Sequence, residues 1–309
     1  MRWGKSVRRW VRFQLLRALL TPLAWLPRSC GLRFFGAVGR SVLPRVARAR
    51  EPILANTQRV FPDWPAAQRR DFVRRVGWHL GRNAFDFVRL SRTSLEEIER
   101  LVVVEGQEHL ERARRAGLGV ICLSAHLGCW ELLPYRMRGL GYRVAVVYRH
   151  LRDPRLDRYV AERRRRFGIE AYERDRDGRA ILRCLREGAL LGVLADQDTR
   201  VDSIPVPFLG VPARTPTGPV RLALRTGAPL VPVVIAMGLD GRHRLQFGAE
   251  IPLDPALASA SGEALAEGIQ GATRRCNEAI GALILPAAEQ WVWFHQRWGP
   301  RGEQRGDGG

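Results

Sequence analysis

From about residue 101 onward, the chain alternates short apolar runs with stretches whose apolar positions lie three and four residues apart. The short runs are "LVVVEG", "GVICLSAH", "RVAVVYR", "ALLGVLAD", "PLVPVVIAM" and "RLQFGAEIPL". The stretches with helical spacing cover 107–116, 154–167, 178–187 and 217–226. Strands that are apolar on both faces and alternate with helices are typical of a sheet covered on both sides. The pattern predicts an α/β fold with a mainly parallel, layered sheet flanked by helices.

The segments on either side of this alternation are predicted to be helical. Residues 51–100 include "AAQRRDFVRRVGWHLGRNAFDFVRL" after the turn-like "FPDWP", and apolar positions recur there at helical spacing. A last helix is expected over about 261–283. The chain has no long Gly/Ser linker and no internal repeat, so we expect one domain over 51–300 that includes the helical approach segment. Residues 301–309, "RGEQRGDGG", are expected to be a disordered tail.

Residues 1–50 mix Trp, Phe and Leu with Arg at short intervals. A helix with aromatic and leucine residues on one side and arginines on the other suits a membrane interface, where cations meet anionic headgroups. The alternative is an amphipathic helix that packs on the protein's own core. No run of about 18 uncharged apolar residues occurs, which argues against an ordinary membrane-spanning helix, and Arg12, Gln14 and Arg17 interrupt what would be a signal-peptide core. We therefore expect a helical membrane-associating segment on a peripheral or monotopic protein.

The charge balance narrows the choice of partners. The sequence has 51 basic and 31 acidic residues, a net charge of +20, so its surface should attract nucleic acid, anionic lipid or an acidic carrier protein. The five cysteines are widely spaced without a CxxC pair, and the six histidines form no HExxH or similar cluster. We therefore expect a reducing compartment and no metal site.

The stretch "SAHLGCWE" carries the main candidate chemistry. Ligands of open α/β sheets bind at the carboxyl ends of strands, and the run before His126 brings it to such an end. Glu131 could accept a hydrogen bond from one ring nitrogen and leave the other free to take a proton. Gly128 would permit a tight loop and close approach of substrate. Taken alone, the pair also fits an ordinary strand end, and Cys129 admits a thiol nucleophile paired with His126.

A resemblance adds to this pattern. "HLGCWE" is similar to the H-x4-D/E motif of lysophospholipid-type acyltransferases, and more closely to the HxGNWE version of the bacterial lipid A late acyltransferase family. Four further segments resemble that family in the same order. They are "VYRHLRDPRLDRYVAERRRRFG", "LADQD", "VPFLGVPARTPTGPVRLALRTGAPLVPVV" and "AAEQWVWFHQRW". Two departures are Cys129, where the family often has Asn, and Ala288-Glu289, which replaces the usual Pro-Glu or Pro-Asp.

The resemblance implies an enzyme that moves a fatty acyl chain from acyl carrier protein, or from coenzyme A, to a hydroxyl of a lipid A precursor. His126 would be the general base and Glu131 its orienting partner, with no acyl-enzyme and no cofactor. Asp196, which ends "ALLGVLAD", and Arg164 match family positions and are expected to contact substrate. Arg149 follows "RVAVVY" and should emerge at the same edge of the sheet. Such an enzyme is expected on the cytoplasmic face of the inner (plasma) membrane.

Other functions fit less well. The nearest alternative is acyl transfer to a lysophospholipid or another glycolipid, but the chain lacks the NHxxxxD and FPEGT-like blocks expected of glycerol-phosphate acyltransferases. A basic nucleic-acid-binding protein would explain the charge but not the ordered motifs, and no zinc finger or RNP signature occurs, so no nucleic acid partner is expected. The absence of GxSxG and of GxGxxG after a strand disfavours a serine hydrolase and a hydride-transfer enzyme.

Overall fold

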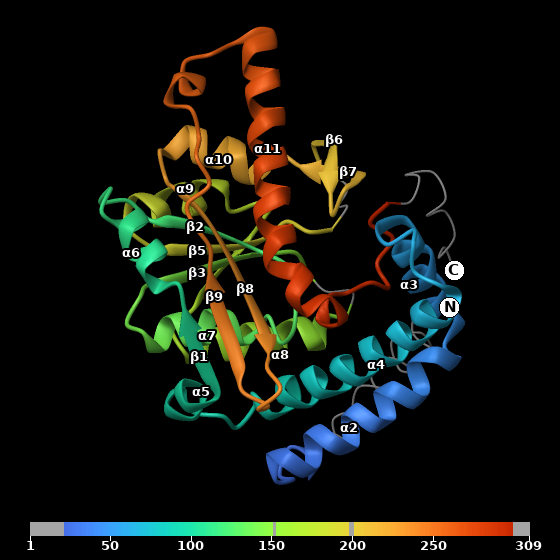
Figure 1. Cartoon of the computed structure of the whole chain (residues 1–309). Helices are drawn as coiled ribbons and strands as arrows, with labels where there is room; N and C mark the ends of the chain where they lie inside the picture. The colour runs from blue at the N-terminus through green and yellow to red at the C-terminus, as the bar shows by residue number, and fades with distance from the viewer. Residues whose placement is uncertain (1–21, 151–152, 198–200, 299–309) are drawn as a thin grey trace, which may run out of the picture.

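The computed structural model describes residues 22–150, 153–197 and 201–298 (Figure 1). Its centre is a seven-stranded sheet in the order β1-β9-β8-β2-β5-β3-β4. The strands are β1 Val102–Glu105, β2 Val120–Ser124, β3 Val144–Tyr148, β4 Glu170–Glu173, β5 Leu190–Leu194, β8 Leu230–Met237 and β9 His243–Phe247. Every neighbouring pair is parallel except β8 and β9. The predicted mainly parallel α/β fold is confirmed.

Helices cover both faces of the sheet because its central strands are apolar on both sides. In β2, Ile121 and Leu123 face one hydrophobic cluster, and Val120 and Cys122 face another, as the alternation of side chains along a strand requires. The first cluster includes residues of α9, α10 and α11, and the second includes residues of α5, α6 and α7. The bounds are α5 Leu95–Leu101, α6 Gln107–Arg114, α7 Leu132–Gly139, α9 Gly178–Arg186, α10 Gly218–Thr226 and α11 Gly262–Ile284. Helix α8, Pro154–Arg166, lies beside β4.

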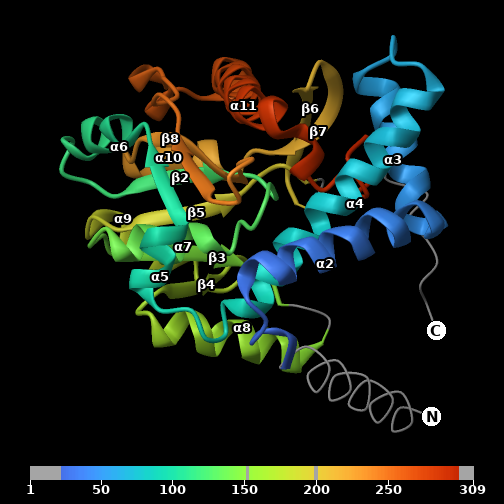
Figure 2. The same cartoon turned by 60° about the horizontal axis from the view of Figure 1, so that its bottom comes forward.

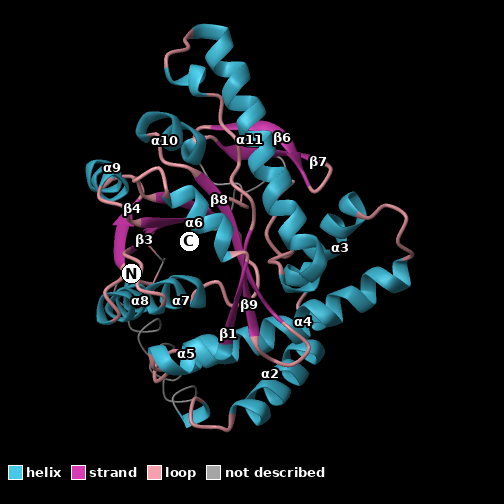
Figure 3. Cartoon of the chain, turned by 60° about the vertical axis from the view of Figure 1, so that its left-hand side comes forward, coloured by secondary structure: helices cyan, strands magenta, loops and turns pink. Residues whose placement is uncertain are grey.

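A separate two-stranded hairpin was not predicted from the sequence. Strands β6, Ser203–Phe208, and β7, Val211–Pro216, pair antiparallel beside α11 (Figure 3). Their turn is Leu209-Gly210, and both residues have positive φ, 49° and 80°, as a tight two-residue hairpin turn requires. The sequence did not predict this hairpin because prolines interrupt both strands, "SIPVPF" and "VPARTP", which therefore lack the apolar runs that mark the other strands. Strand β4 was also missed, because "EAYE" has no apolar run.

The N-terminal helices form a layer at one end of the sheet. They are α2 Arg28–Val42, α3 Ala47–Val60 and α4 Ala66–Arg89, and a short 3-10 turn at Leu43–Arg45 connects the first two. Further 3-10 turns lie at Pro255–Ala258 and Leu285–Gln290. The boundary expected at residue 50 falls inside α3. Among the described residues, no helix combines the length and apolarity needed to cross a bilayer. The tail expected over 301–309, like the first 21 residues, lies outside the described residues.

Helices α2 and α4 lie side by side and antiparallel (Figures 1 and 2). Glycines permit the close contact: a Cβ on Gly39 would lie 2.1 Å from the carbonyl oxygen of Gly77, and one on Gly81 would lie 1.9 Å from that of Phe35. Neither position has room for a side chain. Helix α2 therefore packs on the protein's own α4 along one face, as the alternative interpretation of this segment expected.

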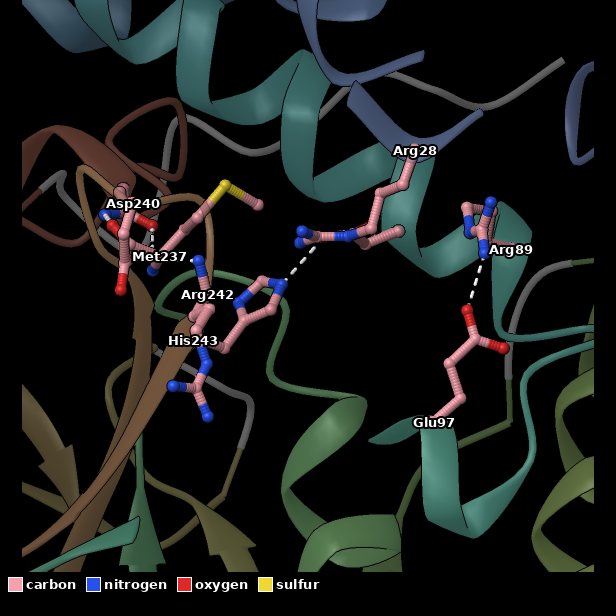
Figure 4. Close-up of polar contacts among 9 residues, drawn as sticks. Arg28, Arg89, Glu97, Met237, Asp240, Arg242 and His243 are labelled. Atoms are coloured by element: carbon pink, nitrogen blue, oxygen red, sulfur yellow. Dashed lines mark hydrogen bonds and ion pairs between the residues drawn. The ribbon is translucent and has the colours of Figure 1, made fainter. Parts of the chain in front are cut away.

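A buried ionic cluster fixes α2 to the body of the protein. Arg28 of α2 donates to the carboxylate of Asp86 in α4 at 2.9 and 2.6 Å, and Nε2 of His243 in β9 lies 2.7 Å from the same carboxylate. Figure 4 shows Arg28 reaching from its helix toward His243. The side chains of Asp86 and His243 are 5% and 0% exposed. This cluster joins three elements that are far apart in sequence.

Candidate active site

The register between β2 and β5 brings His126 and Asp196 together. Ser124 and Leu194 are paired across the two parallel strands, and each candidate residue lies two positions beyond its strand. The ring nitrogen Nδ1 of His126 is 2.8 Å from Oδ1 of Asp196, and the backbone N–H of His126 donates to Oδ2 at 2.9 Å. The pair follows from neighbouring strands that end at the same level.

The surroundings of Asp196 favour a charged pair. Its side chain is fully buried, and Oδ2 also accepts a hydrogen bond from Nε1 of Trp291 at 2.7 Å. Burial opposes ionisation of Asp196, but His126 and Trp291 outweigh it and lower the pKa of the carboxyl. Burial likewise disfavours the imidazolium, yet Asp196, with a smaller contribution from Glu131, raises the pKa of His126 above 6.5. This environment stabilises a proton on the ring.

His126 retains access to a ligand. Its side chain is 21% exposed, and its Nδ1 is engaged by Asp196, which leaves Nε2 for proton transfer. The Asp196 contact sets the orientation of the ring, as a carboxylate does in catalytic triads.

Glu131 does not take the position expected for it. Helix α7 begins at Leu132, so Glu131 stands at its N-cap position. Its carboxylate accepts a hydrogen bond from Nη2 of Arg164 in α8 at 2.7 Å, and the two side chains are 15% and 13% exposed. Asp196, which was expected to contact substrate, occupies the place beside the His126 ring that was expected for Glu131. Glu131 influences His126 through its charge.

Gly128 is required by packing against the sheet. Its φ is 59°, and a Cβ there would lie 2.3 Å from the carbonyl oxygen of Ile235 in β8. Its N–H donates to the carbonyl of Gln290 at 3.1 Å. The amide of Gly128 is therefore already used and is not free to donate to an oxyanion.

The thiol hypothesis finds no support in the structure. Cys129 is 4% exposed, and burial, with the nearby Asp86 and Glu131, raises its pKa well above the usual range. A reactive cysteine needs the opposite environment, one that stabilises the thiolate.

Arg149 lies further from this centre. It follows the end of β3, which is separated from β2 by β5 in the sheet order, and it is exposed. Arg149 contributes to the lowered pKa of Asp175, although Arg174 contributes more. Arg164 thus contacts Glu131 in the loop after β2, whereas Arg149 does not contact that loop.

An apolar cavity of about 260 Å³ is lined by residues that contact the His126–Asp196 pair, although neither His126 nor Asp196 lines it. Trp130, which lines the cavity, meets the His126 ring edge-on with centroids 5.0 Å apart, and Trp291, which holds Asp196, lines it too. Helix α4 supplies another wall through Leu80, Ala84 and Phe87. Neither the contact of Trp291 with Asp196 nor the part of α4 in the cavity wall was predicted from the sequence. The order "QWVWFH" after the last helix was the available signal.

The sequence that forms this site is similar to a known protein family over almost the whole chain. The chain matches the family described as bacterial lipid A biosynthesis acyltransferase over residues 5–299. The chain belongs to this family. It is therefore an acyltransferase, and the family resemblance inferred from the five motifs is confirmed.

Individual relatives of this acyltransferase support the same assignment. The lipid A biosynthesis acyltransferase of Haemophilus influenzae is 24% identical over 276 residues, 89% of this chain and 83% of that protein. The lipid A biosynthesis lauroyltransferase of Escherichia coli K12 is 26% identical over 281 residues, 89% and 85% of the two chains. A phosphatidylinositol mannoside acyltransferase of Mycobacterium tuberculosis CDC 1551 is 27% identical over 200 residues, 63% of this chain and 60% of that protein.

Proposed function

We propose that this acyltransferase moves a fatty acyl chain from a thioester on acyl carrier protein, or on coenzyme A, to a hydroxyl of a lipid A precursor. The observation that carries the proposal is the His126–Asp196 pair, held at 2.8 Å at the carboxyl ends of two parallel strands. Its neighbours Trp130 and Trp291 line an apolar cavity. Both members of the pair and the cavity walls lie within the residues matched by the family.

The proton path follows from the geometry. Nε2 of His126 takes the proton of the acceptor hydroxyl while its oxygen attacks the thioester carbonyl. The tetrahedral intermediate then breaks its C–S bond, and the imidazolium returns the proton to the leaving thiolate. Asp196 stabilises the imidazolium between these two steps, so no acyl-enzyme is needed.

The Glu131–Arg164 pair has a supporting role in this proposal. Arg164 comes from α8 and Glu131 from the loop after β2, so their ion pair connects the reacting loop to a helix. Together with Arg149 at the same edge of the sheet, Arg164 would face the phosphates of a glycolipid or of a donor. Gly128 and the tryptophans beside it would border the acyl chain in the cavity.

The acceptor has one specific alternative. The mycobacterial relative is named for a phosphatidylinositol mannoside, a glycolipid other than lipid A. The proposed chemistry is unchanged for such an acceptor, because only the position of its hydroxyl relative to Nε2 matters.

An assay with two donors and two acceptors tests the reaction. Purified protein is offered a labelled acyl chain as its thioester on acyl carrier protein or on coenzyme A, with a tetraacylated disaccharide lipid or a lysophospholipid. We expect transfer to the disaccharide lipid and its loss in His126→Ala. Robust transfer by His126→Ala would exclude this mechanism, and transfer only to lysophospholipid would exclude this acceptor.

We also propose that the outer face of α2 binds an anionic membrane, on the cytoplasmic side where acyl donors are made. In α2, Phe34, Val38 and Val42 recur every fourth residue and are 56%, 44% and 49% exposed. Trp25 before the helix and Val46 after it are 70% and 42% exposed. The first acidic residue of the whole chain is Glu51, so no carboxylate in residues 1–50 opposes anionic headgroups. Exposed aliphatic and aromatic side chains within a basic segment suit an interfacial helix.

Co-sedimentation with vesicles tests this face. The triple variant Phe34→Ser, Val38→Ser, Val42→Ser should bind vesicles containing phosphatidylglycerol much less than the unmodified protein does. Leu285→Ser is the control, because Leu285 is 47% exposed but lies directly after α11. Equal binding by the triple variant would show that the contact with the membrane lies elsewhere.

A further inference from the structure

One arginine of α4 has no anion beside it. Arg82 is half-buried and lies one turn before Asp86. Within the described chain it makes no hydrogen bond and no ion pair, and its guanidinium carbon lies 5.7 Å from the centre of the Trp78 ring. None of its nitrogens is sealed from solvent. The donors of Arg82 are therefore open to a ligand.

Arg82 lies beside Arg28 at the β8–β9 turn. A Cβ on Gly241 of that turn would lie 3.8 Å from Nη1 of Arg28 and 3.8 Å from Nη2 of Arg82. The two nitrogens are therefore no farther apart than twice that distance. Burial and the charge of Arg28 lower the pKa of Arg82, and Asp86 only partly offsets them. Two like charges thus meet in a half-buried place.

The carboxylates near this pair of arginines are already engaged. Oδ1 of Asp86 accepts from Nε of Arg28, and Oδ2 lies 2.6 Å from Nη2 of Arg28 and 2.7 Å from Nε2 of His243. Asp240 of the β8–β9 turn accepts two hydrogen bonds from Arg244, at 3.0 and 3.2 Å. Nη1 of Arg28 takes no part in these bonds. The two guanidinium groups therefore offer donors that no anion of the described chain uses.

A phosphate matches these donors. Guanidinium groups bind phosphate oxygens through charged hydrogen bonds, which are about 2.9 Å long from nitrogen to oxygen. One phosphate with such a bond on each side bridges two nitrogens at this separation. A single phosphate would also offset the repulsion between Arg28 and Arg82.

The surroundings indicate where the phosphate comes from. Leu239, in the same β8–β9 turn, is fully exposed. Leu32 of α2 lies 3.9 Å from the Cβ position of Gly241, so this turn is next to α2. At a bilayer surface an apolar side chain reaches the acyl region, while cationic groups stay at the level of the headgroups. An exposed leucine beside two arginines fits that arrangement better than it fits a phosphate free in water.

We infer that Arg28 and Arg82 together bind the phosphate of one membrane phospholipid headgroup, with Leu239 inserted beside it. The choice of a membrane lipid rests on the proposed contact of α2 with the bilayer, whereas the phosphate site rests on the two arginines. Arg82 does not line the apolar cavity, so this lipid is neither the acyl donor nor the acceptor. The site would add a specific headgroup contact to the apolar face of α2.

A water-soluble phospholipid tests the site without a bilayer. Calorimetric titration of the full chain with dihexanoyl phosphatidylglycerol, below its micelle concentration, should show one saturable site. Arg82→Gln should weaken this binding about 10-fold or more, because it removes charged hydrogen bonds. Arg82→Lys, which keeps the charge without the planar donor group, should have an intermediate affinity. Arg74→Gln is the matched control: it removes an exposed arginine two turns earlier in α4 and should leave the affinity almost unchanged.

Inorganic phosphate separates the two sources of the anion. It should bind the unmodified chain about 10-fold more weakly than the lipid does, and Arg82→Gln should weaken it too. Equal affinity for inorganic phosphate and for the lipid would overturn the assignment to a membrane lipid. Equal losses of lipid affinity in Arg82→Gln and Arg74→Gln would indicate diffuse attraction and overturn the site, as would unchanged affinity in Arg82→Gln.

Vesicles containing phosphatidylglycerol separate this inference from the proposed membrane contact. Leu239→Ser should weaken vesicle binding and leave the affinity for the soluble lipid unchanged, and the triple variant of α2 should do the same. If the triple variant binds vesicles normally while Arg82→Gln loses the soluble lipid, the proposed face of α2 fails and the phosphate site stands. If vesicle binding depends on α2 and binding of the soluble lipid does not depend on Arg82, only the phosphate site fails.

Discussion

The molecule contains two buried His–Asp pairs that look alike in distance and differ in surroundings. His126 and Asp196 are 2.8 Å apart, and His243 and Asp86 are 2.7 Å apart. The His126 side chain is 21% exposed and contacts Trp130 of the cavity wall, whereas that of His243 is fully buried. Asp86 also receives two hydrogen bonds from Arg28, whereas Asp196 accepts from the neutral indole of Trp291 and from the backbone N–H of His126, and from no arginine in the described part of the chain. A His–Asp contact therefore becomes a candidate for proton transfer only when the ring reaches a ligand and no permanent cation neutralises the carboxylate.

The largest expected effect comes from removing the histidine of each pair. His126→Ala should lower kcat by about 10²- to 10⁴-fold, the usual contribution of general-base catalysis, with little change in unfolding temperature. His243→Gln should do the reverse: a lower unfolding temperature and nearly normal kcat in the folded protein. Steady-state kinetics and thermal unfolding on both variants make the comparison, and loss of turnover in His243→Gln would remove the distinction.

Changing the carboxylate of the active pair should alter both rate and pH dependence. Because Asp196 raises the pKa of His126, kcat/KM of the unmodified enzyme should fall as the pH drops through a value above 6.5. In Asp196→Asn, burial acts without that carboxylate and lowers the pKa, so the acid limb should move to lower pH while the maximal rate decreases. The measurement is the pH profile of kcat/KM, and an unmoved acid limb would contradict the assigned partner.

Removing the carboxylate of the second acid near His126 should have a smaller effect. Glu131→Gln breaks the ion pair with Arg164 but leaves the His126–Asp196 contact in place. We expect a moderate loss of kcat/KM and an acid limb that shifts slightly to lower pH, because Glu131 adds to the raised pKa of His126 only through its charge. A loss as large as that of His126→Ala would indicate that Glu131 is itself the orienting residue.

The carboxylate of the inactive pair should affect stability and leave turnover almost unchanged. Asp86→Asn leaves Arg28 without its anion, and we expect a loss of about 2 kcal/mol in the free energy of unfolding, less than for a fully buried pair because Arg28 is partly exposed. The pKa of Asp86 is lowered, since His243 and Arg28 outweigh burial. Its contribution is thus complete above about pH 3.8 and is lost as the pH falls through the lower, folded-state value. Denaturant unfolding at several pH values should show this acid-dependent loss in the unmodified protein and not in Asp86→Asn.

The sequence predicted the layered fold and the position of His126 because both depend on local pattern. Apolar runs and helical spacing mark strands and helices, and a residue just beyond a strand lies at the ligand-binding edge. The partner of His126 depends on which strands are neighbours: Asp196 is 70 residues away and reaches the ring only because β5 pairs with β2 in register. Periodicity carries no information on that pairing, so Glu131, close in sequence, seemed the natural partner.

The cavity was hidden from the sequence for a similar reason. Asn83 lies within a helix whose apolar spacing is ordinary, and its placement depends on how α4 is rotated against the loop after β2 and the segment around Trp291. A polar residue in such a helix is usually exposed. Only the packed structure shows that this one is enclosed.

The glycine contacts between α2 and α4 determine how the enzyme would meet a bilayer. At Gly39 and Gly81 the two backbones touch without intervening side chains, and the same α4 forms a wall of the cavity. Helix α2 therefore has no room to roll or tilt independently. If the outer face of α2 binds lipid headgroups, the depth and orientation of the cavity relative to the membrane plane are therefore fixed. Lipid substrates would then always approach the cavity in the same orientation.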